Sequence, residues 1–237
     1  MVAHDEAIYS GQVAYRGLIP MEYLDEETRE WARDTTNFSG QRRHVLTYPI
    51  GPNYRTLNIV AFMPEERQGD ESWTSQGSLD DLSNEVAGWT EQIQRIMTAW
   101  KRFQKTTMKQ ALYEHKPLSH WTDSDGHLVV LGDAAHAMLP HQGQGTGQAI
   151  EDGVTLALCL QGVSHSNIRK RLDYYFHLRK DRTDRVVTTS RDAGRVASSA
   201  NPDKRTPIDL EAMKQRWQWL WKYDPIAAFG AEKENYL

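Results

Sequence analysis

Short apolar runs in the first part of the chain predict an antiparallel sheet. Each run is rich in β-branched and aromatic residues, which favour strands. The second and third runs are separated by Gly51-Pro52-Asn53, which is a turn signal. We therefore expect strands over residues 12–19, 43–50 and 54–62.

The pattern then changes to a helical one. Residues 64–77 are polar and charged and predict a solvated loop, after which Ser78 and Asp81 have the spacing of a helix-capping box. We expect a helix in two pieces with a break near Gly88. In the second piece apolar residues recur at helical spacing, which indicates a core face rather than a binding site: Trp89, Ile93, Ile96, Met97 and Trp100.

The centre of the chain predicts one further strand. Residues 112–121 look extended around Pro117, and a turn at 123–126 launches an apolar strand over 128–131. A glycine-rich loop then opens a helix that ends near Leu160.

The last part of the chain is mainly helical. Residues 168–197 have the apolar stripe of one long amphipathic helix, with arginines on the remaining face. Asn201-Pro202 ends this helix, and the Trp-rich segment 217–223 packs a last one.

Composition is that of an ordinary globular protein. The chain has 237 residues, 39% apolar and 25% charged, with a net charge of -4. This argues against a nucleic-acid binder with a basic field over the whole chain. Residues 162–205 carry a local charge of +6, from eleven Lys/Arg and five Asp. Interspersed acids and the apolar stripe favour a solvated face on a docked helix there over a nucleic-acid site.

Cysteine usage and the amino terminus predict a cytoplasmic protein without a membrane partner. The single cysteine, Cys159, cannot form an internal disulfide, and its apolar helix predicts a packed thiol. Residues 1–6 lack the basic region and apolar core of a secretory signal. No apolar run approaches the ~18 residues that a membrane span needs.

The candidate chemistry lies around Asp133, just past the predicted strand over 128–131. A carboxylate there can accept two charge-assisted hydrogen bonds from vicinal hydroxyls, as on a polyol chain. Gly143, Gly145 and Gly147 remove side chains where a ligand approaches backbone. The helix that follows points its unpaired N–H groups and its positive end to the same place. The pattern predicts a polar cofactor.

Two other interpretations of these residues stay open at this point. The glycines can simply permit tight packing, with Asp133 capping the helix, because short glycine patterns are common by chance. Asp133, His136 and His141 can also form a metal triad, since His and carboxylate are ordinary zinc or iron ligands. No further Cys or His falls at a matching spacing.

A longer pattern carries a family resemblance. The run Gly132-Asp133-Ala134-Ala135-His136, then Pro140, then 141–152 (HQGQGTGQAIED) resembles the flavin-contacting motif of class A FAD-dependent monooxygenases, in the salicylate hydroxylase-like branch. Residues 15–20 (YRGLIP) and 219–224 (WLWKYD) are similar to stretches at corresponding places in that branch. The similarity spans nearly the full chain.

The resemblance implies a fold and a cofactor. The fold is α/β, or α+β in this chain: part of a glutathione-reductase-like FAD domain, an antiparallel substrate-domain sheet and C-terminal helices. Asp133 binds the ribityl hydroxyls of FAD, and Pro140 lies beside the isoalloxazine edge. Backbone N–H groups face the pyrimidine side, where they stabilise negative charge. The cofactor-binding residues are Gly132, Asp133, Pro140, Gly143, Gln144, Gly145, Thr146 and Gly147.

The implied activity is hydroxylation of a small phenol or salicylate-type substrate with NAD(P)H and O2. No residue is assigned as catalytic, and His136 is a structural loop residue. The substrate wall is the sheet face with Arg16, His44, Tyr48 and Asn58, unless these are surface strand residues. Arg16 can bind a substrate carboxylate bidentately or pair with a neighbouring acid.

The chain departs from the family at its start. Members begin with a βαβ unit that carries Gly-x-Gly-x-x-Gly, followed later by an Asp-Gly motif, and this sequence has neither. It resembles the carboxy-terminal part of such an enzyme. We expect a substrate-domain part over 1–117, a flavin-contacting part over 118–165 and a helical part over 166–237. The chain alone then binds FAD weakly or not at all, and the alternative is a non-catalytic remnant that needs a partner for the missing half.

Overall fold

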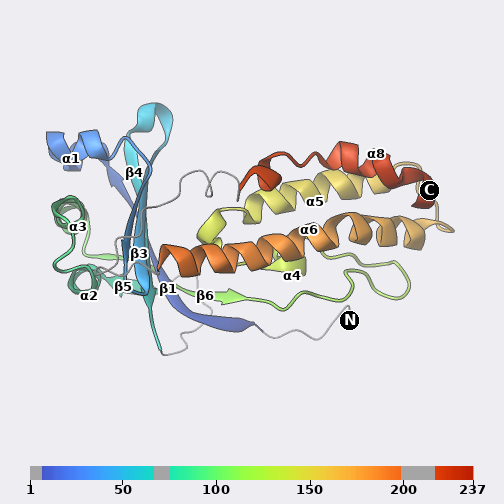
Figure 1. Cartoon of the computed structure of the whole chain (residues 1–237), viewed down its shortest axis with the longest axis horizontal. Helices are drawn as coiled ribbons and strands as arrows, with labels where there is room; N and C mark the ends of the chain where they lie inside the picture. Colours follow the sequence, from blue (N-terminus) through green and yellow to red (C-terminus); the bar gives the residue numbers. More distant parts are fainter. Residues whose placement is uncertain (1–6, 67–74, 199–216, 237) are drawn as a thin grey trace. The chain divides into compact units, whose positions relative to one another are not determined.

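The computed structural model describes residues 7–66, 75–198 and 217–236. Contacts divide the chain into two compact units. The sheet unit comprises Tyr9–Leu112 and Arg195–Arg205, and the helical unit comprises Met1–Ile8, Tyr113–Gly194 and Thr206–Leu237. Figure 1 labels their elements. The three-part division expected from the sequence stays a prediction.

The sheet unit is built on a six-stranded sheet with the order β2-β3-β4-β1-β6-β5. The three predicted strands are confirmed as β1, β3 and β4, which pair antiparallel with one another around β4. The strands are β1 (Ile8–Pro20), β2 (Thr36–Gly40), β3 (Arg43–Ile50), β4 (Thr56–Pro64), β5 (Gln76–Ser78) and β6 (Thr106–Glu114).

Three strands were missing from the sequence prediction. β2 and β5 are short and mostly polar, and they pair antiparallel with β3 and β6 respectively. β6 begins at Thr106, before the extended segment that was expected over 112–121. The predicted loop over 64–77 is wrong at Pro64, which ends β4, and at Gln76 and Gly77, which lie in β5. Its residues 67–74 lie outside the described ones.

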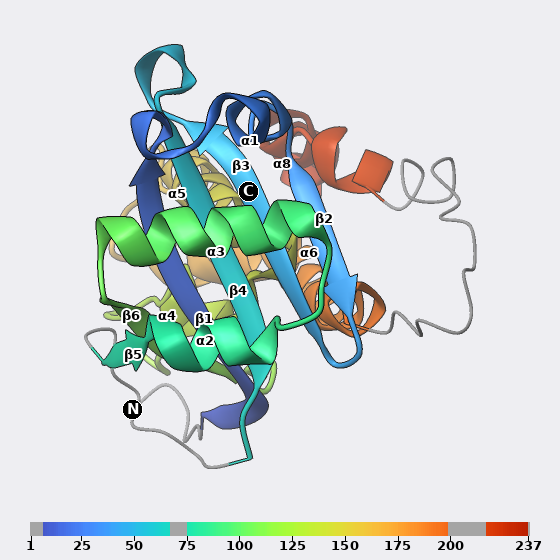
Figure 2. The same cartoon turned by 90° about the vertical axis from the view of Figure 1, so that its left-hand side faces the viewer.

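Helices cover one face of this sheet (Figure 2). They are α2 (Leu79–Glu85) and α3 (Glu91–Phe103), beside the short α1 (Glu26–Trp31) and the 3-10 turns Met21–Tyr23 and Pro52–Tyr54. The two-piece helix is confirmed: the Ser78 side chain caps α2 by accepting from Asp81 N, and Gly88 has a φ of 77° in the break.

The core of the sheet unit lies between these helices and the covered face. The predicted apolar face of α3 is confirmed, because Ile93, Ile96, Met97 and Trp100 are buried in the core and Trp89 packs against it. Gly17 on β1 permits the close approach of α3. A Cβ on Gly17 would lie 2.1 Å from Cζ2 of Trp100.

The helical unit contains α4 (Asp133–His136), the 3-10 turn Pro140–Gln142, α5 (Gly145–Cys159), α6 (Ile168–Ala197) and α8 (Pro225–Tyr236). Both long helices were predicted, and residues 217–221 add one helical turn before α8. Asn201-Pro202, the predicted end of α6, lies outside the described residues. Figure 1 shows α5, α6 and α8 side by side.

Aromatic rings fill the core of the helical unit. Trp121, Tyr174, Tyr175 and Phe229 are buried there together with Cys159. Cys159 is a free, buried thiol, which confirms the packed interpretation.

The predicted strand over 128–131 is wrong. Val129 forms an isolated antiparallel bridge with Thr122, and Val130 N donates to Trp121 O. A strand needs a neighbour along its length, and the backbone bonds of this segment among the described residues reach only residues 121–123, just across the turn. Within the described ranges, no helix is both long enough and apolar enough to cross a membrane.

Candidate functional site

Strand alternation places the predicted substrate residues on one face of the sheet. Tyr15, Val45 and Ile59 point into the core under α2 and α3. Their neighbours Arg16, His44 and Asn58 therefore point to the opposite face, as does Tyr48, which pairs with Asn58 in the register.

Arg16 is a partly buried guanidinium on that face. Its Nε donates to Gln110 Oε1 over 3.2 Å, and Arg16 has no ion pair within the described part of the chain. Burial lowers the pKa of Arg16, and Tyr48 partly offsets this effect. A desolvated cation of this kind favours an anionic ligand. The alternative that Arg16 pairs with a neighbouring acid has no support among the described residues.

His44 lies deeper in the same unit. It is 4% exposed, its Nδ1 lies 3.0 Å from Ser198 Oγ, and its ring stacks on Phe62 with centroids 4.4 Å apart. His44 thus contacts Phe62 and Ser198, the residue that directly follows α6. The Asn58 Nδ2 atom is buried and has no hydrogen-bond partner among the described residues.

The glycine loop, residues 140–147, leads into α5 in the helical unit. Gln144 precedes α5, and no side chain caps the helix start. Gly143 has a φ of 61°, and a Cβ on Gly143 or Gly145 would meet no atom within 4 Å. Gly143 N donates to Pro140 O, whereas the first N–H groups of α5 are open to a ligand. This arrangement fits a polar or anionic ring edge.

Helix α6 fixes the same loop from its other side. Ser190 Oγ donates to Leu139 O, and Thr189 Oγ1 donates to Gln142 Oε1 over 3.0 Å. Gly194 lets α6 approach the His141 ring, because a Cβ there would lie 2.3 Å from His141 Cδ2. Burial lowers the pKa of His141 to about 4, so its ring is neutral at pH 7.

Asp133 is the exposed first residue of α4, directly after the buried Gly132. Its neighbour His136 is buried and hydrogen-bonds Asp152 instead of a shared ligand. Across the described residues no group of three His, Cys, Asp or Glu could hold a metal ion, so the triad of Asp133, His136 and His141 is not assembled.

A buried ionic cluster lies beneath the Asp133 turn, and the sequence analysis missed most of it. Asp152 of α5 accepts from Gly132 N, His136 and Arg179. Arg179 also binds Gln148 and Glu151. Arg179 was assigned to the solvated arginine face of its helix, and this is wrong: its side chain is fully buried. Asp152 stood in the motif, but no sequence signal pointed to Arg179.

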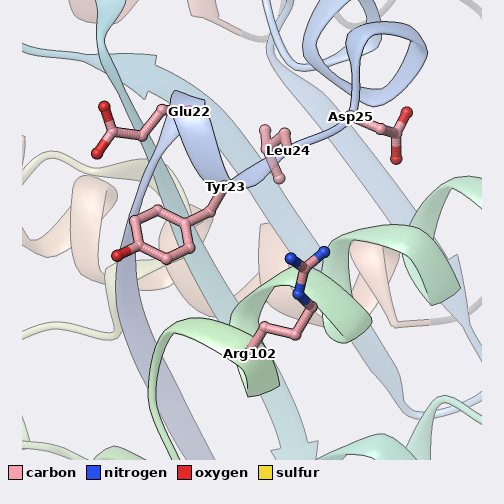
Figure 3. A pocket seen from close by; sticks show the side chains of 5 residues that line it. All are labelled: Glu22, Tyr23, Leu24, Asp25 and Arg102. Carbon is pink, nitrogen blue, oxygen red and sulfur yellow. The ribbon is translucent and has the colours of Figure 1, made fainter.

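A surface hollow of about 500 Å³ in the sheet unit contains none of the predicted site residues. In Figure 3 the Arg102 guanidinium extends toward Leu24, whereas the side chains of Glu22 and Tyr23 lie on the other side. The ring of Tyr23 makes an edge contact with Phe103 at 4.8 Å. The mixed charges of this open hollow show no preference for one ligand.

Known proteins resemble the whole chain. The family model described as an FAD binding domain matches residues 28–190. A 6-methylsalicylate 1-monooxygenase of Aspergillus terreus is 34% identical over 234 residues, which are 96% of this chain and 49% of that protein. A salicylate hydroxylase of Pseudomonas putida is 30% identical over 91% of this chain and 52% of its own length.

Solved structures agree in fold. A salicylate hydroxylase in a substrate complex superposes with a TM-score of 0.81 and 29% identity, over 95% of this chain and 57% of that one. CtdE in complex with FAD and a substrate superposes with a TM-score of 0.80 at 21% identity, over 99% of this chain and 58% of that one. This chain spans about half the length of the relatives it matches. It belongs to the FAD-binding domain family, within the salicylate hydroxylase-like class A flavoprotein monooxygenases.

Proposed function

We propose that the chain is the carboxy-terminal portion of an enzyme that hydroxylates a phenol or salicylate-type substrate with NAD(P)H and O2. The observation that carries the proposal is the open glycine loop before the uncapped start of α5, in the same unit as the exposed Asp133. These groups fit a flavin, which has a polyol chain and a ring edge that gains negative charge on reduction.

The residues that would hold FAD are those expected from the family motif. Asp133 would accept from the ribityl hydroxyls, and Pro140 would lie beside the edge of the ring. Gly143 would let the ring approach the loop, and Gln144 to Gly147 would donate backbone hydrogen bonds to it. Bound FAD supplies the redox chemistry, in which two electrons from NAD(P)H reduce O2, one oxygen atom enters the aromatic ring and the other leaves as water. This chain's residues bind the cofactor, orient the substrate and exclude water.

The relatives suggest the substrate class. Two of them are named for 6-methylsalicylate and salicylate, which are aromatic acids. The partly buried Arg16, with its Nε on Gln110 and no acid partner among the described residues, supports binding of a carboxylate or phenolate. Tyr48 and His44, on the same sheet face, are the other proposed substrate residues.

A second candidate is a non-catalytic remnant that folds against a partner. The observation in its favour is exposed apolar surface on the helical unit: Leu128 is 49% exposed, Leu131 39% and Ile150 63%. Exposed apolar side chains of this kind can be covered by a partner chain.

One experiment tests both candidates. The chain is mixed with FAD, alone and together with the amino-terminal half of the Aspergillus terreus relative, and NAD(P)H oxidation is followed with salicylate and 18O2. We expect little bound FAD for the chain alone, and for the mixture bound FAD and a product with one 18O atom. Bound FAD without labelled product would favour the remnant. Failure of the mixture to bind FAD would contradict the proposed function.

A further inference from the structure

The short helix α4 contacts a single carboxylate oxygen at both of its ends. At its start, Gly132 N donates to Asp152 Oδ2 over 2.9 Å. At its last residue, His136 Nε2 lies 2.6 Å from the same oxygen. A carboxylate can only accept, so Nε2 carries the hydrogen of this bond. Four residues cannot form a stable helix by themselves, so these bonds fix the turn.

The backbone at Gly132 is fixed on both sides of the residue. Its φ of 57° and ψ of -140° lie in a region that residues with a Cβ avoid. Its N–H binds Asp152, and its carbonyl accepts from the N–H groups of Ala135 and His136, at 2.9 Å each. Asp133 follows directly, so its position depends on these bonds.

Asp152 is in turn fixed by α6. Its Oδ1 accepts from Arg179 Nε over 2.8 Å, and both side chains are fully buried. Burial alone would raise the pKa of Asp152, but the bonds from His136, Arg179 and Gly132 outweigh it and hold the pKa below its usual value. The carboxylate therefore stays ionised at neutral pH and can accept all three bonds.

His136 also packs into the core of the helical unit. It is 4% exposed, and its ring lies against Trp121 with centroids 5.4 Å apart. The Asp133 turn is thus joined through His136 to Asp152 of α5 and to the aromatic core.

We propose that Asp152 and His136 are positioning residues for the flavin: they fix both ends of α4 so that the exposed Asp133 carboxylate meets the ribityl chain. The inference rests on the proposed flavin site. Neither residue touches the cofactor. With Asp133 fixed in this way, the chain should bind a flavin that has the polyol chain more tightly than one that lacks it.

The test compares two probes on the full chain together with the amino-terminal half of the Aspergillus terreus relative. Riboflavin has the polyol chain, and lumiflavin carries a methyl group in its place, so only riboflavin can use Asp133. Affinities come from fluorescence quenching with flavin in excess. We expect His136→Leu to lower riboflavin affinity about tenfold, the size of a lost charge-assisted hydrogen bond, with lumiflavin affinity unchanged. Asp133→Asn should reproduce this loss of selectivity.

The matched control is His136→Gln, whose amide N–H can take the place of Nε2–H on Asp152. We expect it to keep the selectivity of the unaltered chain. If His136→Leu does not fold, Asp152→Asn is measured in the same way, since it keeps the shape but removes one acceptor oxygen.

The outcomes separate the inference from the proposed function. Equal losses for both probes, or unchanged riboflavin affinity in His136→Leu, would overturn the inference and leave the flavin site intact. If the unaltered chain binds lumiflavin as tightly as riboflavin, the inference fails as well. Binding of neither probe by the unaltered chain in this mixture would overturn the flavin site itself, and the inference with it.

Discussion

Arg179 of α6 donates from Nε to Asp152 Oδ1 of α5 over 2.8 Å, and neither side chain is exposed to solvent. Removal of one partner from such a pair leaves a buried charge without compensation. We expect Arg179→Met to lower the free energy of unfolding by about 3–5 kcal/mol, measured by urea denaturation.

The matched control lies on the same helix. Arg169 pairs with Asp173, but both side chains are about half exposed. Exposed pairs of this kind contribute roughly 0–1 kcal/mol, so Arg169→Met should have little effect. Similar losses for the two variants would contradict a special role of the buried pair.

Arg179 also marks how far the sequence predicts the helical unit. The apolar stripe over 168–197 predicted α6 to the residue, because helical periodicity is a local property. Periodicity could not show that one arginine points inward, since its partners Asp152 and Glu151 are more than 25 residues away in the chain. The missed pairing therefore reflects tertiary contacts.

The candidate site likewise has parts that the sequence predicted and parts that depend on tertiary contacts. The motif around Asp133 and the sheet face with Arg16 were found from residue types and alternation. The strand expected over 128–131 was wrong, because an apolar run becomes a strand only where a neighbour supplies hydrogen bonds. The short polar strands β2 and β5 were missed for the converse reason, as their neighbours, not their own residues, determine them.

Substitution of two glycines of the helical unit by alanine should change the free energy of unfolding in opposite directions. A Cβ on Gly194 would lie 2.3 Å from His141 Cδ2, so Gly194→Ala must displace the ring, and we expect a loss of about 1–3 kcal/mol. A Cβ on Gly153 of α5 would meet no atom within 4 Å, so Gly153→Ala should stabilise by roughly 0.5–1 kcal/mol through helix propensity. Thermal denaturation measures both, and a gain for Gly194→Ala would show that the contact with His141 is absent.

His141 should make stability depend on pH. Burial lowers its pKa from 6.5 to about 4, so between these values the unfolded chain binds the proton more readily. The stability that the neutral His141 ring contributes is complete above the pKa of the unfolded chain, 6.5, and is lost as the pH falls toward the folded pKa of about 4. Between pH 7 and 5 the loss is about 2 kcal/mol of unfolding free energy. His141→Gln should remove this part of the pH dependence, and an unchanged profile in that variant would contradict it.

The thiol of Cys159 should be inert in the folded chain. Burial raises its pKa to about 12, so almost no thiolate forms at pH 8. We expect a thiol reagent to react only after denaturant is added, with one equivalent per chain. Rapid reaction without denaturant would contradict the buried position.

Arg16 should distinguish substrates by charge. A hydrogen bond to a charged group contributes about 1.5–3 kcal/mol, so Arg16→Met should weaken salicylate binding roughly tenfold to a hundredfold. Binding of an uncharged, carboxylate-free analogue should change little. The measurement is a titration of the chain together with the amino-terminal half of a relative, and Arg102→Met, on the exposed surface of α3, is the control. Unchanged salicylate affinity in Arg16→Met would exclude the carboxylate role. The structure motivates this role, because Arg16 is partly buried and has no acid partner among the described residues.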